Sequence, residues 1–103
     1  MNAAEHTLHR LMVTENSRYH MADDICIAVR DERTGCWHRT HQAVGAHVVG
    51  SLRVTKDGSV VARIGSPTPG ERVIFSTDVV TSPLVAIETG SDVFESIPLA
   101  GAA

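Results

Sequence analysis

The chain has 103 residues and a mass of 11.1 kDa; 43% of its residues are hydrophobic and 20% are charged. This is the length and composition of one globular domain, which can bury a core without disulfides or a structural metal. Nine Lys and Arg against twelve Asp and Glu give a net charge of -3, and the cations are scattered singly along the chain. Because nucleic-acid binding usually needs a clustered basic face, this distribution argues against a general nucleic-acid-binding function.

No segment has the character of a membrane span or of a secretory signal. The longest apolar runs, such as residues 84–87, are only a few residues long, whereas a membrane-spanning helix needs roughly 18. The N-terminal residues are polar and contain neither a basic start nor an apolar run. Together with two cysteines, which a reducing compartment keeps as thiols, this predicts a cytoplasmic protein with no membrane contact.

We expect one domain with two loose ends. Residues 1–10 form an N-terminal arm, in which apolar residues show weak helical spacing without a capping residue. Residues 11–88 form a single small β domain. Residues 89–103 form a flexible C-terminal tail, because this stretch contains glycine, proline and small residues with few charges.

The first half of the domain has the pattern of short strands. β-branched residues and period-two alternation dominate, and polar turn residues punctuate the chain. The expected elements are a strand pair at 11–14 and 18–21, a strand at 25–30, a turn at 31–35, a return strand at 36–40 and a single helical turn at 41–46. Ile25, Ile27 and Val29 alternate with their neighbours, so we predict that they share one face of their strand.

The second half continues the same pattern. The expected strands are 48–54, 60–64, 73–75 and 84–88. Lys56-Asp57-Gly58 joins the first two of these as a hairpin, and Pro67 and Pro69 interrupt the ladder because neither can donate a hydrogen bond to it. Six to seven short strands joined by short turns predict a mainly β fold, a small antiparallel barrel or meander of the SH3-like or a similar type. The alternative is an α+β fold with an N-terminal helix packed on the sheet.

The densest patch of reactive side chains lies at residues 36–41, which read Cys-Trp-His-Arg-Thr-His. Pairing of this segment with the preceding strand places Cys36 opposite Arg30. In that register Cys26, Cys36 and His38 share one face, and all three are ligand types that zinc accepts. Their spacing fits no common zinc-binding pattern, and the two cysteines would lie roughly 13 Å apart, too far for a disulfide. A metal at these three residues is therefore the alternative to ordinary hairpin side chains, and we expect no cofactor.

Cys36 and His38 are also the candidates for nucleophilic chemistry, because an imidazole on the same strand face could activate the thiol. The sequence does not indicate a third residue that would complete a catalytic triad with Cys36 and His38. The sequence contains no nucleophile-elbow, zinc-protease or phosphate-loop motif. We therefore predict a protein that is not an enzyme, with a metal- or thiol-dependent protein that uses these two residues as the alternative.

The single tryptophan, Trp37, is predicted to be a core residue beside Ile27 and Val29. If it were exposed near Arg33 and Arg39, it could instead stack on a single-stranded nucleic-acid base or on a side chain of a partner. Nucleic-acid binding through Trp37 and the nearby arginines is thus a further alternative.

These observations favour a non-enzymatic binding or adaptor protein that acts through protein–protein contacts. A small sheet protein has edge strands to cover, and either an unidentified partner protein or a second copy in a homodimer could cover them. We expect an edge strand or a loop face to form the contact. The candidate binding residues are Arg30, Arg33, Trp37, His38 and Arg39.

Overall fold

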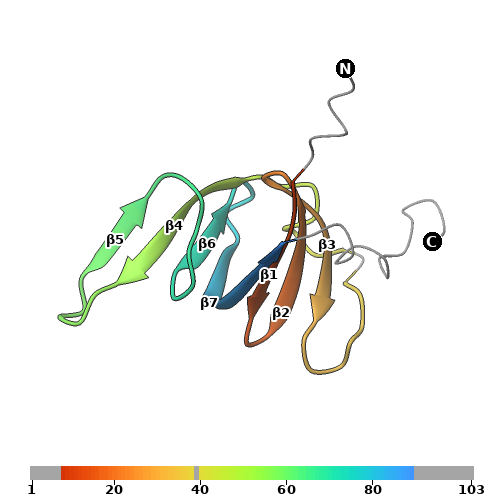
Figure 1. The fold of residues 1–103 in the computed structure, drawn as a ribbon, viewed down its shortest axis with the longest axis horizontal. Helices are drawn as coiled ribbons and strands as arrows, with labels where there is room; N and C mark the ends of the chain where they lie inside the picture. Colours follow the sequence, from red (N-terminus) through yellow and green to blue (C-terminus); the bar gives the residue numbers. More distant parts are fainter. Residues whose placement is uncertain (1–7, 39, 90–103) are drawn as a thin grey trace, which may run out of the picture.

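The computed structural model describes residues 8–38 and 40–89, which form seven antiparallel strands and no helix. The strands are β1 (His9–Thr14), β2 (Ser17–Ala22), β3 (Ile25–Asp31), β4 (Val48–Val54), β5 (Val60–Arg63), β6 (Arg72–Phe75) and β7 (Val80–Thr89). They make one sheet in the order β3-β2-β1-β7-β6-β4-β5 (Figure 1). The prediction of a mainly β fold with six to seven short antiparallel strands is confirmed. In the part of the chain that is described, no helix is long and apolar enough to cross a membrane.

The sheet bends but does not close into the barrel that the sequence predicted. β7 has 10 residues and pairs with β1 through its second half and with β6 through its first half. Register shifts in four of the strand pairs bend the sheet further. A single bridge between Ile25 and His47 connects β3 to the segment that leads into β4. Because no ladder joins the outer strands β3 and β5, the sheet stays open.

The core lies between the two halves of the bent sheet. Tyr19 of β2 and Phe75 of β6 come from opposite halves, and their ring centroids are 5.6 Å apart. The buried cluster around them comprises Met12, Tyr19, Met21, Cys26, Val29, Ala43, Ala46, Val73, Phe75 and Leu84. Burial of each large apolar side chain in such a cluster contributes roughly 1.5–3 kcal/mol, so this cluster holds the bend in place.

A bulge in β3 changes which of its residues face the core. The register between β2 and β3 shifts so that Ile27 is the extra residue. Cys26 and Val29 are therefore fully buried, whereas Ile25 and Ile27 are 45% and 43% exposed. The prediction that Ile25, Ile27 and Val29 share one face is wrong, because the bulge interrupts the alternation on which it depended.

The return strand expected at 36–40 is not formed. A single bridge between Arg30 and Trp37 takes its place. The Asp31 carboxylate accepts two backbone N–H groups of the turn, and the Asp31 N–H donates to the carbonyl of Cys36 at 2.8 Å. This capped turn pairs Cys36 with Asp31 and brings Trp37 opposite Arg30. The predicted register, with Cys36 opposite Arg30, is therefore wrong by one residue.

The strands extend slightly beyond the predicted domain. β1 begins at His9, within the predicted arm, and β7 ends at Thr89, the first residue of the predicted tail. The rest of the predicted arm and its helical alternative fall largely on residues 1–7, and the rest of the tail on 90–103, all outside the described residues. Residues 41–46 form hydrogen-bonded turns in place of the expected helical turn.

The hairpin of β4 and β5 forms as predicted. The Thr55 N–H donates to the Ser59 carbonyl at 2.8 Å, and Gly58 has a φ of 88°, which a residue with a side chain rarely adopts. Gly50 in β4 is required for a different reason. A Cβ at this position would lie 2.5 Å from the carbonyl oxygen of Arg63, so only glycine lets the two strands approach this closely.

Candidate functional site

The predicted binding residues lie on β3 and the loop that follows it. We call Arg30, Arg33, Trp37 and His38 the arginine–tryptophan surface; Arg39 lies outside the described residues. The guanidinium carbon of Arg30 is 5.4 Å from the centroid of the Trp37 ring, and Arg30 Nε donates to the carbonyl of Gly35 at 2.8 Å. Arg33 and His38 are exposed. The structure thus brings Arg30 and Trp37 into contact.

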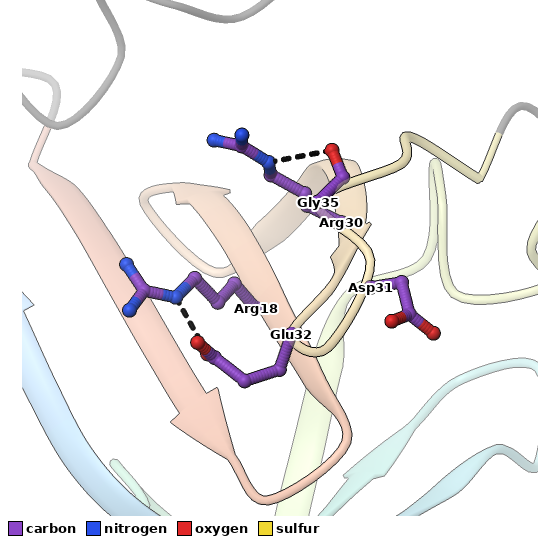
Figure 2. A pocket seen from close by; sticks show the side chains of 5 residues that line it. All are labelled: Arg18, Arg30, Asp31, Glu32 and Gly35. Atoms are coloured by element: carbon purple, nitrogen blue, oxygen red, sulfur yellow. Dashed lines mark hydrogen bonds and ion pairs between the residues drawn. The ribbon is translucent and has the colours of Figure 1, made fainter.

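An open pocket of about 270 Å³ adjoins this surface and is lined by Arg18, Arg30, Asp31, Glu32 and Gly35. Figure 2 shows Arg18 and Glu32 pointing toward each other, with Arg18 Nε 2.6 Å from Glu32 Oε2, while the carboxylate of Asp31 points away. The hydrogen bond that Arg18 donates to the Glu32 carboxylate raises the pKa of Arg18 above its usual value. This mixture of charges resembles a polar protein surface more than a phosphate site, which would concentrate positive charge.

Trp37 is not in the core, and the prediction that it packs with Ile27 and Val29 is wrong. It is half-buried and lies on the opposite face of the sheet from Val29, because it is bridged to Arg30. Its ring contacts the ring of His20, with the centroids 5.1 Å apart. The one-residue change in register after the turn, which pairs Trp37 with Arg30 and not with Val29, moves the tryptophan to this outer face.

A second set of buried residues lies on the outer face, where the Trp37 ring contacts His20. Leu11 and His20 are cross-strand partners, and with Val13 they are 4%, 3% and 7% exposed, although none belongs to the main core. Burial, with smaller contributions from the charges of Arg30 and Arg18, lowers the pKa of His20 to about 4. His20 is therefore neutral at physiological pH.

The structure places the three proposed metal ligands in different surroundings. Cys26 is buried near the start of β3, and its Sγ donates to the Ala28 carbonyl at 3.6 Å. Cys36 is exposed beyond the end of β3, and His38 Nε2 is 3.9 Å from a carboxylate oxygen of Asp31. Within residues 8–38 and 40–89, no group of three His, Cys, Asp or Glu side chains could hold a metal ion.

The two thiols should react at very different rates. Burial raises the pKa of Cys26 to about 12, whereas Cys36 is exposed. We expect one thiol to react with a thiol-specific reagent in the native protein and two in denaturant, with Cys26 slower by about 10³-fold or more because so little thiolate forms. The Cys36→Ser variant should lose the fast reaction, and rapid native labelling of both thiols would contradict the buried position of Cys26.

An exposed apolar face on the other half of the sheet was not among the candidate sites predicted from the sequence. The register places one set of apolar residues on the face turned away from the core: Leu52, Val54, Val60, Ala62, Ile74 and Val80. We call this set the outer apolar face. Val54 and Val60 are 59% and 61% exposed, and on the opposite face of β5 Val61 is 45% exposed. The sequence feature that could have indicated this face is Val60-Val61. Two successive apolar residues in a strand point to opposite faces, so at least one of them lies away from the core.

β5 is an outer strand of the sheet, and its edge lacks the usual protection. All four of its residues are exposed, and Figure 1 shows it at the margin of the molecule. The strand contains no proline, and its pairing with β4 has no register shift. Its one charged residue, Arg63, is held by Glu71. In natural proteins, free charges, prolines or bulges usually prevent an edge strand from pairing with another chain. The edge of β5 has none of these features and can therefore accept another strand.

A buried carboxylate anchors the base of this hairpin. Glu71 is fully buried and accepts hydrogen bonds from Arg63 Nε at 2.8 Å, from Ser51 Oγ at 3.1 Å and from the Thr68 N–H at 2.9 Å. Arg53 lies 3.3 Å from the same carboxylate. These hydrogen bonds, with Arg63 first, hold the pKa of Glu71 well below its usual range. The network ties β4, β5 and the loop before β6 together.

Among the described residues, the fold and these surfaces define a small domain built on one open sheet, with an exposed edge at β5. No protein-family model, curated protein or solved structure matches the chain.

Proposed function

We propose that this protein is a non-enzymatic binding module that acts through protein–protein contacts, and that the edge of β5 receives a strand of its partner. The observation that carries this proposal is the exposure of β5 on both faces, with Val60 at 61% and Val61 at 45%. Exposed apolar groups that adjoin a free edge favour strand addition, in which main-chain hydrogen bonds supply affinity and the side chains supply specificity.

The hairpin of β4 and β5 is preorganised for strand addition. β4 pairs with four residues of β5, and the Glu71 network holds Arg63 at the end of that strand. A preorganised strand loses less conformational entropy on association than a flexible segment does. The rigid hairpin therefore supports binding at its outer edge.

Site-specific photo-cross-linking in cells tests this function. A photoreactive amino acid at Val60 should yield a discrete adduct of higher mass, whereas the same amino acid at Val85, which is 57% exposed on β7, should not. The Ala62→Pro substitution should abolish the adduct, because it removes a backbone N–H from the edge. No adduct at Val60, or equal labelling at Val60 and Val85, would refute the proposal.

The arginine–tryptophan surface is a second candidate contact for the same function. The position of Trp37 outside the core favours it, because Trp and Arg are the residue types that most often dominate protein interfaces. The photoreactive amino acid placed at His38, which is exposed, tests this surface in the same experiment.

A further inference from the structure

We infer that the strand received by β5 is β5 of a second copy, in an antiparallel pair with a two-fold axis at Val61. This inference rests on the proposed function and names its partner. In this arrangement Val60 of one copy lies opposite Ala62 of the other, and the two Val61 residues face each other. The two sheets join into one.

The first support is the direction of the backbone groups. Because the Thr55 N–H donates to the Ser59 carbonyl, the alternation of an antiparallel ladder directs the N–H and C=O groups of Val61 toward β4. Those of Val60 and Ala62 are then directed away from β4, to the open edge. A two-fold axis at Val61 places these outward groups opposite each other, which gives four hydrogen bonds between the copies.

The second support is the match of the side chains. Val60 and Ala62 lie on the outer apolar face, and Val61 lies on the opposite face. The proposed register pairs residues of the same face across the axis, as a continuous sheet requires. All three apolar residues of β5 then meet only one another. Arg63 falls opposite Ser59 of the second copy and keeps its ion pair with Glu71, so no like charges are brought together.

The edge of β5 is also accessible to a second copy. β5 is the outermost strand of its half of the sheet (Figure 1). Because the contact is short, with four residues of β5 from each copy, we expect a dimer of micromolar affinity. The outer apolar face of each copy would continue across the joint.

Sedimentation velocity of the full chain from about 5 to 500 µM tests the dimer, a range that spans micromolar dissociation constants. We expect the wild type to shift from monomer to dimer across this range. Val61→Lys should weaken dimerisation at least about tenfold, because it places two like charges opposite each other at the axis. The matched variant Val85→Lys, at an exposed valine of β7, should dimerise as the wild type does. A wild type that stays monomeric, or an equal loss in both variants, would overturn the inference.

Disulfide cross-linking tests the register. In a Cys36→Ser background, Val61→Cys should form a covalent dimer on mild oxidation, because the facing residues of a non-hydrogen-bonded pair have Cα atoms about 4.5 Å apart. Ser59→Cys is the control, since its two copies would lie roughly 13 Å apart along the strands. A covalent dimer with Ser59→Cys but not with Val61→Cys would exclude this register.

These experiments separate the two proposals. If the protein is monomeric and the photoreactive amino acid at Val60 captures a different protein, the edge is a binding site but its partner is not a second copy. If Val60 captures nothing and the protein is monomeric, both proposals fail. If the adduct at Val60 has twice the mass of the chain, both stand.

Discussion

Replacement of Glu71 by alanine is expected to lower the free energy of unfolding by about 2–3 kcal/mol, because it leaves Arg63, Ser51 and the Thr68 N–H without their shared acceptor. This loss is smaller than the loss expected when one partner of a wholly buried ion pair is removed, because the side chains of Arg63 and Arg53 are 42% and 55% exposed and can be hydrated. Urea denaturation at neutral pH measures the loss.

Two further variants identify the cause of this loss. Ser51→Ala removes one neutral donor and should cost about 1 kcal/mol, less than Glu71→Ala. Glu71→Gln keeps the shape of the side chain but removes its charge, so its loss of unfolding free energy should lie between those of Ser51→Ala and Glu71→Ala.

The stabilisation by Glu71 also depends on pH. Because the pKa of Glu71 is lowered on folding, this stabilisation is complete above the pKa that the Glu71 carboxyl has in the unfolded chain, and it is lost as the pH falls below that value. Equal stability of wild type and Glu71→Ala at neutral pH would show that the network does not stabilise the fold.

Acidification from pH 6.5 to pH 4 is expected to destabilise the protein by up to about 3 kcal/mol through His20, whose pKa falls from 6.5 to about 4 on folding. In this range the unfolded chain binds a proton that the buried, neutral imidazole does not. Stability therefore rises with pH through this window and is complete above it. Denaturation midpoints at several pH values measure this dependence.

The His20→Gln variant provides the control, because glutamine does not titrate. Its stability should change less between pH 6.5 and pH 4 than that of the wild type. His41 also has a lowered pKa, because it is partly buried, and contributes in the same direction, so His41→Gln serves as the matched variant. An unchanged pH dependence in His20→Gln would mean that the imidazole binds a proton equally well in the folded and unfolded states, which would contradict a pKa that is lowered on folding.

Much of the strand content could be predicted because it depends on local chemistry. The hairpin of β4 and β5 follows from Lys56-Asp57-Gly58, where glycine adopts a positive φ and the Asp57 carboxylate accepts the Ser59 N–H. The strand pair β1 and β2 follows from alternation and from the polar turn between them. Turn residues and side-chain alternation act over a few positions, so a sequence pattern is enough to identify them.

The location of the candidate contacts could not be predicted in the same way. A bulge at Ile27 and a capped turn at Asp31 each shift the alternation by one residue, which turns Cys26 inward and Trp37 outward. The sequence pattern of β5 also does not distinguish a buried strand from an exposed one. Its valines are exposed because β5 ends as an outer strand of the sheet.

The class of fold, most of the strands and the hairpin that carries the proposed contact thus follow from the sequence pattern, since they depend on turn chemistry and on period-two alternation. Three features are visible only in the three-dimensional fold: the open sheet, the burial of Glu71 beneath two arginines and the exposed edge at β5. These features depend on which strands become neighbours, and strand order arises from packing between segments that are far apart in the chain.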